Sequence, residues 1–233
     1  MRLLIISLAF IFMFPVLIKA FEDNFNDGNA DGWLVAAGKW EVSNSEYHAP
    51  EQVNTAPYPL TFALDGKELS EFTIKARVRN DKFHTTMNQS HAGFAFGMDS
   101  KNTGYVLYFR FHTGLKCANA ASLVLRYTIE NGKGWDPNAD VAEGCNVFEA
   151  HDKEKWHTLE AQVHTKDGTL RAWADGNQAL DVNIKLSPGK VGLWVADIGA
   201  GSFDDVSIIG PGIMAVKSYG SVSTMWGDIK DRH

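Results

Sequence analysis

The chain has 233 residues, of which 45% are hydrophobic, with 22 basic and 28 acidic side chains. This length and apolar content are enough for one hydrophobic core, and all-β sandwiches reach this size as a single domain. The formal net charge of −6 argues against nucleic acid or an anionic lipid surface as the main partner, because both attract basic proteins.

The first 20 residues have the layout of a secretory signal peptide. Arg2 precedes an apolar run, residues 3–14, and the small residue Ala20 stands at the predicted cleavage point. The run is too short to span a bilayer comfortably, and no second hydrophobic segment follows it. We therefore predict a secreted, extracellular protein without a membrane span. Without Arg2 and Lys19, 20 of the 22 basic residues remain against 28 acidic ones, a formal charge of −8.

Alternating hydrophobic and polar residues predict short β-strands, separated by turn residues, over most of residues 21–210. No stretch after the signal peptide has sustained helical periodicity, so we expect one all-β domain, an antiparallel two-sheet sandwich. Residues 211–233 change character and form a tail of unknown role. The alternatives for this tail are an added edge hairpin, a short terminal helix, or a sorting or docking segment, which could join the protein to a larger surface assembly. The predicted strand segments are residues 21–40, 39–43, 46–50, 57–66, 70–80, 91–99, 104–114, 122–134, 155–164, 169–176, 178–184, 190–196 and 201–209.

The chain contains two cysteines, Cys117 and Cys145. An even pair in an exported protein usually forms a disulfide, so we predict a Cys117–Cys145 bridge. The bridge would tie the turn-rich segment 135–150 across the preceding strands. Closing a loop of this length stabilises a fold by roughly 3–4 kcal/mol in the chain-entropy model.

Acidic residues lie in both the first and the last predicted strand. Asp204 and Asp205 stand in a β-branched segment, where an acidic pair is poorly placed unless something cationic lies beside it. Jelly rolls bring their terminal strands together, and calcium prefers carboxylate and carbonyl oxygens. We therefore predict a calcium site formed by Glu22, Asp23 and Asp204. The alternative is a set of solvated turn carboxylates.

Basic and aromatic side chains alternate with apolar ones along three of the predicted strands. If these strands are neighbours, the side chains share one outer face, and its arginines could grip carboxylates or sulfates of a glycan. The alternative is a solvated sheet face with ordinary cross-strand pairs. The residues of this predicted ligand face are Arg77, Arg79, Tyr108, Arg110, His112 and Arg126.

Three tryptophans are candidates for stacking on sugar rings, because an aromatic face complements the apolar face of a pyranose. Trp173 and Trp194 fall opposite the apparent core face of their strands, and Trp135 lies in the long loop, a common place for recognition. We expect core or turn packing for Trp33, Trp40 and Trp156.

Several motifs resemble those of the concanavalin A-like lectin/glucanase superfamily, and most closely its laminin-G-like and carbohydrate-binding-module branches. They are DNFNDGNADGW, GKWEV with EY, AGFAFG, KWHTLEAQV, and GKVGLWV with FDDVSI, which together cover residues 21–209. The resemblance implies a jelly-roll sandwich, a structural calcium between the first and last strands, and an extracellular polysaccharide or glycan as partner. The superfamily's glucanases carry Glu-x-Asp-x-x-Glu, and this sequence contains no Glu-x-Asp.

We therefore predict a secreted, lectin-like carbohydrate-binding module that does not cleave its glycan. Two alternatives stay open at this point. One is a polysaccharide lyase or glycoside hydrolase, since Arg77, Tyr108, Arg110 and His112 are the residue types that lyase chemistry needs. The other is a laminin-G-like adhesion domain that binds protein.

Overall fold

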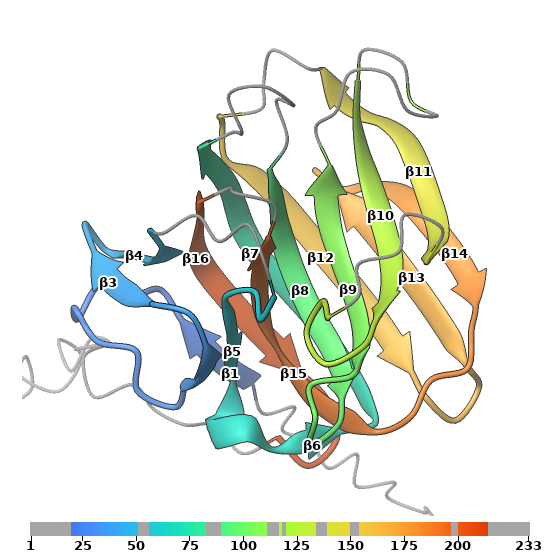
Figure 1. Ribbon diagram of the computed structural model, residues 1–233, viewed down its shortest axis with the longest axis horizontal. Coiled ribbons are helices and arrows are strands. Elements are labelled where there is room, and N and C mark those ends of the chain that lie inside the picture. The colour runs from blue at the N-terminus through green and yellow to red at the C-terminus, as the bar shows by residue number, and fades with distance from the viewer. Residues whose placement is uncertain are drawn as a thin grey trace, which may run out of the picture.

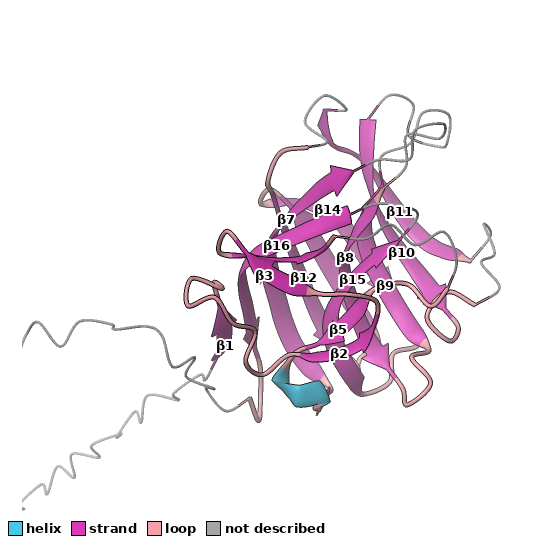
Figure 2. Cartoon of the chain, turned by 60° about the vertical axis from the view of Figure 1, so that its left-hand side comes forward, coloured by secondary structure: helices cyan, strands magenta, loops and turns pink. Residues whose placement is uncertain are grey.

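The computed structural model describes residues 20–50, 56–82, 90–110, 117, 120–133, 139–149, 154–196 and 200–213. Within these residues the chain forms two antiparallel sheets and one short 3-10 helix, η1 (Leu64–Gly66), as Figures 1 and 2 show. The predicted all-β jelly-roll sandwich is therefore confirmed. Residues 1–19 and 214–233 lie outside the described part, so the signal peptide and the role of the tail stay predictions. No helix in the described part is long and apolar enough to cross a membrane.

The first sheet, which we call sheet A, has eight strands. Its seven-strand path begins at one edge with β14 and ends at the other with β3, and β1 pairs with β16 outside this path. In spatial order the strands are β14 (Asn177–Asn183), β13 (Thr169–Ala174), β12 (His157–His164), β7 (Glu71–Lys82), β16 (Ala200–Ile209), β4 (Glu46–Ala49) and β3 (Glu41–Ser43), with β1 (Ala20–Asp23) added on β16.

The second sheet, sheet B, also has eight strands. Its path runs from β11 to β2, and β6 pairs with β15 outside this path. In spatial order the strands are β11 (Asp140–Glu149), β10 (Ala120–Thr128), β9 (Gly104–Arg110), β8 (His91–Met98), β15 (Gly189–Ala196), β5 (Leu60–Phe62) and β2 (Leu34–Ala37), with β6 (Glu68–Leu69) added on β15.

The main hydrophobic core lies between the two sheets and follows from simple alternation. On β7, Phe72, Ile74, Ala76 and Val78 are all buried in this core. Successive side chains of a strand point to opposite faces, so the polar residues between them lie on the outer face of sheet A. This face is the polar side that an antiparallel sheet commonly presents to water.

The central strands of sheet B differ because they are buried on both faces. Leu107 and Phe109 of β9 belong to the main core, whereas Val106 and Tyr108 of the same strand belong to a second apolar cluster, together with Trp194 of β15. This second cluster lies on the outer face of sheet B. Strands covered on both faces have nearly continuous hydrophobic sequences, which explains the apolar sequences of β8, β9 and β15.

The two ends of the described domain lie side by side. β1 pairs antiparallel with β16, and Phe21 stands opposite Ile208. The prediction that the first and last strands meet is confirmed.

The predicted disulfide is also confirmed. Cys117 and Cys145 are bonded, with their Cα atoms 5.2 Å apart, within the usual range for such bridges. The bond joins the segment before β10 to β11, at one edge of sheet B.

Candidate functional site

The predicted common face of basic residues is wrong, because its residues belong to different sheets. Arg77 and Arg79 lie on β7 in sheet A, whereas Tyr108, Arg110 and Arg126 lie on β9 and β10 in sheet B. The two groups occupy opposite outer faces of the sandwich. Alternation assigns each side chain to one side of its own strand, but strand order decides which strands are neighbours. His112 lies outside the described residues.

The outer face of sheet B carries a network of charged side chains. Arg110 donates through Nη2 to Asp140 Oδ2 and, over 3.1 Å, to the Tyr108 hydroxyl; its Nη1 donates to Glu143 Oε1 over 3.4 Å. Arg126 Nε donates to Asp140 Oδ1 over 2.7 Å. The two arginines and the two carboxylates cancel in charge, and their side chains are between 3% and 16% exposed.

Burial fixes the protonation states within this network. Burial raises the pKa of Tyr108 to about 12, although both neighbouring arginines act to lower it. Burial acts to lower the pKa of Arg110, but the adjoining Tyr108 and Asp140 raise it overall. Tyr108 therefore stays a neutral phenol and Arg110 stays a cation at any ordinary pH. These residues form a structural polar core on sheet B that solvent hardly reaches.

Trp194 belongs to this covered face, so the prediction that its ring is exposed is wrong. The side chain is fully buried, and its indole N–H donates to Asn131 Oδ1 over 3.0 Å. Its ring packs on Tyr58 and Tyr108, with centroid distances of 5.8 and 5.3 Å. The position opposite the core face was read correctly, but a second apolar cluster covers that side. Trp135 lies outside the described residues.

The three predicted calcium ligands do not come together. Asp23 is buried and accepts hydrogen bonds from the Phe25 amide (2.9 Å) and the Trp33 indole N–H (2.8 Å). Burial raises the pKa of Asp23, and these two hydrogen bonds act against that rise. Glu22 is adjacent in the strand and exposed, so it points to the other side of the sheet from Asp23. In the pairing of β1 with β16, Glu22 stands opposite Ser207 and Asp23 opposite Val206, whereas Asp204 stands opposite Arg77 of β7 and contacts it.

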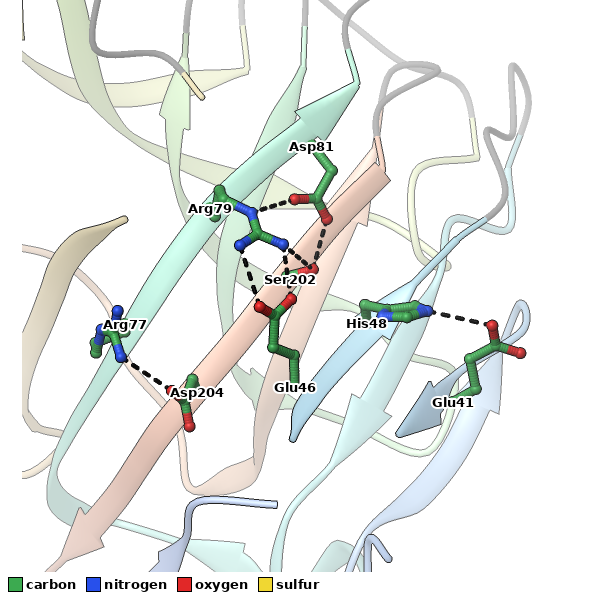
Figure 3. Close-up of polar contacts among 8 residues, drawn as sticks. All are labelled: Glu41, Glu46, His48, Arg77, Arg79, Asp81, Ser202 and Asp204. Carbon is green, nitrogen blue, oxygen red and sulfur yellow. Dashed lines mark hydrogen bonds and ion pairs between the residues drawn. The ribbon is translucent and has the colours of Figure 1, made fainter. Parts of the chain in front are cut away.

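No cluster of three or more His, Cys, Asp or Glu side chains suited to a metal occurs in the described part of the chain. The cation beside Asp204 is instead the guanidinium group of Arg77, whose Nη1 donates to Asp204 Oδ2 over 3.0 Å (Figure 3). The predicted grouping of three ligands is thus wrong, and calcium binding stays a prediction without an assigned site.

A β-bulge places two consecutive carboxylates beside Arg77. Asp204 stands opposite Arg77 and Ser207 opposite Lys75, so β16 contains one extra residue here. Asp205 has a φ of 49°, in the left-handed region that few residues other than glycine adopt, although aspartate tolerates it. Its backbone N–H donates to Asp204 Oδ1 over 2.7 Å, and its Oδ2 lies 3.7 Å from Arg77 Nη1. Bulges commonly re-aim side chains near functional sites.

Burial and crowding act together on the Asp204 carboxyl group. Burial is the main cause that raises its pKa, and the carboxylates of Asp205 and Glu46 raise it further. The hydrogen bond from the Asp205 amide and the charge of Arg77 act in the opposite direction. Negative charge is therefore concentrated at the bulge.

An indole ring completes this arrangement at the start of β12. The Arg77 Cζ atom lies 4.7 Å from the ring centroid of Trp156, and the Arg79 Cζ atom lies 4.4 Å from it. Arg79 is fully engaged: two of its nitrogens donate to the two oxygens of Glu46 (3.1 and 2.6 Å), and its Nε donates to Asp81 over 2.5 Å. Figure 3 shows Arg77 and Arg79 on β7, where Arg77 faces Asp204 of β16, and Arg79 faces Glu46 of β4 and Asp81 of β7 itself.

Arg77 differs from Arg79 because most of its guanidinium group is available. Its side chain is 41% exposed, and only Nη1 has a hydrogen-bond partner in the described part of the chain. The Asp205 side chain is 58% exposed, and Trp156 is half-buried. We call Arg77, Trp156, Asp204 and Asp205 the bulge site.

Half of the bulge site is predictable from the sequence. Arg77 is a predicted ligand residue and Asp204 a predicted metal ligand, whereas packing is expected for Trp156 and no role is assigned to Asp205. The acidic pair within a β-branched segment was the available signal for the bulge. Trp173 lies on the same outer face, opposite Glu160, which pairs with Lys75 over 3.2 Å.

Comparison with known proteins identifies the fold. No protein-family model matches the chain, and no curated protein sequence matches it. A carbohydrate-binding module, CBM66, from Bacillus subtilis superposes with a TM-score of 0.58 and 15% identity, covering 78% of this chain and 98% of that one. A lectin from Bauhinia forficata in complex with GalNAc superposes with a TM-score of 0.55 and 11% identity, covering 82% of this chain and 97% of that one. A β-glucanase from Bacillus licheniformis superposes with a TM-score of 0.54 and 10% identity, with the same two coverages. The fold is thus the concanavalin A-like jelly roll. Sequence identities this low support no conclusion beyond the fold.

Proposed function

We propose that the protein is a lectin-like carbohydrate-binding module that recognises an extracellular glycan at the bulge site without cleaving it. The observation that carries this proposal is the combination of the accessible Arg77 and Asp205 side chains with the half-buried Trp156 ring on the outer face of sheet A. Two fold relatives, the Bacillus subtilis module and the Bauhinia forficata lectin, are carbohydrate-binding by name. Their similarity to this chain supports the proposal.

The chemistry of the bulge site suits a sugar. A pyranose presents an apolar face of C–H groups, which an indole can cover, and a rim of hydroxyls that both donate and accept hydrogen bonds. Arg77 supplies donors and Asp205 supplies acceptors within one ion-pair distance of each other. Both side chains come from adjacent strands, and sites built on strands hold their geometry better than sites on loops.

Two of the four residues that favoured a lyase, Tyr108 and Arg110, give it less support. Tyr108 is fully buried and its pKa is raised to about 12. A phenol must be deprotonated to act as a base, and this high pKa makes its deprotonation near neutral pH unfavourable. Arg110 is engaged by Asp140 and Glu143. Their position within a covered, neutral network favours a structural role over contact with a polysaccharide.

We further propose that this binding takes place outside the cell. The signal-peptide layout of residues 1–20 and the Cys117–Cys145 bond both support export, because disulfides persist in oxidising compartments.

A glycan array tests the proposed function. We expect the purified protein to bind a defined group of glycans, to release no shorter products from them, and to lose most of its signal on Trp156→Ala. Arg171→Ala is the matched control, because Arg171 is an exposed arginine of β13 in sheet A, paired with Asp181. Binding to no glycan, or turnover of a bound polysaccharide, would contradict the proposal. Repeating the array with a chelator tests the predicted calcium dependence separately.

A further inference from the structure

The bulge site also contains information about the kind of glycan, and this inference rests on the proposed function. We propose that the site selects a neutral glycan and holds two neighbouring hydroxyls of one sugar ring between Arg77 and Asp205. Three properties of the site lead to this conclusion: its charge balance, its matched donor and acceptor groups, and its rigidity.

The charge balance around the bulge site is acidic despite the two arginines there. Arg77 is the one cation of the bulge site, and it faces the carboxylates of Asp204 and Asp205. Beside it, Arg79 faces Glu46 and Asp81. Two positive charges therefore meet four negative ones. A uronate or sulfate group would approach the exposed carboxylate of Asp205 together with Arg77, and like charges at this range repel. The idea from the sequence that the arginines could grip carboxylates or sulfates of a glycan did not include these acidic partners.

The free donors and acceptors match hydroxyl groups. Within the described residues, the Nε and Nη2 groups of Arg77 have no hydrogen-bond partner, so they present N–H donors in a planar fork. Asp205 presents carboxylate oxygens, which accept hydrogen bonds. A hydroxyl donates one hydrogen bond and accepts others, so two neighbouring hydroxyls can accept from Arg77 and donate to Asp205 together. A carboxylate or sulfate ligand has no hydrogen to donate to Asp205.

The site is held in this geometry before any ligand arrives. The Asp205 N–H bonds to Asp204 Oδ1, and Asp204 Oδ2 accepts from Arg77. The Trp156 ring lies against the guanidinium groups of both Arg77 and Arg79. A preorganised site loses little conformational entropy on binding, so a small number of hydrogen bonds to hydroxyls can be sufficient.

The experiment compares neutral glycans with uronic acid-containing and sulfated ones by titration calorimetry, at low and at high salt. Three variants accompany the wild type. Arg77→Lys keeps the positive charge but loses the planar guanidinium fork. Asp205→Gly removes the carboxylate, and glycine readily adopts the positive φ of this position. Arg171→Lys is the control. Thermal melting establishes that each variant is folded.

We expect binding of a neutral glycan with an affinity that hardly changes with salt. Arg77→Lys and Asp205→Gly should each weaken binding roughly ten- to hundredfold, the scale of a lost hydrogen bond to a charged group, and Arg171→Lys should leave it unchanged. Binding only to anionic glycans, with affinity that falls as salt rises, overturns this inference and leaves the proposed function standing. Full binding by folded Arg77→Lys or Asp205→Gly also overturns it. Binding to no glycan overturns both this inference and the proposed function.

Discussion

The two outer faces of the sandwich use the same residue types for different purposes. On sheet B, Arg110 pairs with Asp140, and their own side chains are 6% and 16% exposed. On sheet A, Arg77 pairs with Asp205, and their side chains are 41% and 58% exposed. Buried charges interact strongly but become costly when a partner is lost, whereas exposed pairs contribute little to stability and keep their groups accessible. Burial, more than residue type, distinguishes the structural face from the candidate binding face.

Removing the shared carboxylate of the buried network should have the largest effect. Asp140→Ala leaves the guanidinium groups of Arg110 and Arg126 without the carboxylate that both contact. We expect a loss of about 3–5 kcal/mol in the free energy of unfolding, measured by urea denaturation. Asp181→Ala, in the exposed pair with Arg171, is the control and should cost at most about 1 kcal/mol. Equal losses of unfolding free energy in the two variants would show that burial does not determine how much an ion pair contributes to stability on the two faces.

Loss of the disulfide should come next. The double variant Cys117→Ser with Cys145→Ser opens a loop with a sequence separation of 28 residues. We expect a loss of about 3–4 kcal/mol, because the unfolded chain regains the entropy that the bond removes. Urea denaturation of the variant and of the oxidised wild type measures this difference. Unchanged stability would mean that the bond does not constrain the unfolded chain.

A smaller effect, dependent on pH, is expected at Asp23. Burial raises its pKa in the folded state, so the folded protein holds this proton more tightly than the unfolded chain does. The contribution of Asp23 to stability is therefore most favourable in acid, and it declines as the pH rises from the unfolded pKa through the folded pKa. Asp23→Asn should remove this decline.

Asp23→Asn has a second consequence that is independent of pH. One amide oxygen replaces the two carboxylate oxygens that accept from Phe25 and Trp33, and an unsatisfied buried donor costs about 1–3 kcal/mol. The free energy of unfolding of both proteins, measured across the acid range, gives a difference curve. A difference in the free energy of unfolding that does not change with pH would contradict the raised pKa of Asp23.

The smallest effect on stability is expected at the bulge site itself. Arg77→Ala removes a half-exposed ion pair, and such pairs contribute about 0.2–1 kcal/mol. The variant should melt close to the wild type. A large drop in melting temperature would mean that Arg77 is part of the structural framework, like Arg110.

Local patterns were enough to predict the fold, but not the surroundings of each side chain. On β7, alternation placed Phe72, Ile74 and Val78 in the core correctly. On β15 the same rule placed Trp194 on the outer face, but it could not reveal the second apolar cluster that buries the ring.

The candidate site depended on contacts between strands that are distant in sequence. Arg77 and Asp204 are 127 residues apart, yet they are cross-strand neighbours. Strand order and the register shift in β16 decide this contact, and neither follows from periodicity. The sequence therefore indicated that Asp204 needs a cation, and only the sheet topology identified that cation as Arg77.

We propose that the exposed face of sheet A, and not the covered face of sheet B, binds the glycan. The most direct test is to follow backbone amide and indole N–H signals by NMR while the glycan found by array is added. We predict that shifts concentrate around Arg77, Asp205 and the Trp156 indole, while the Trp194 indole signal stays in place. Shifts confined to the outer face of sheet B, with the Trp156 indole unchanged, would contradict the account.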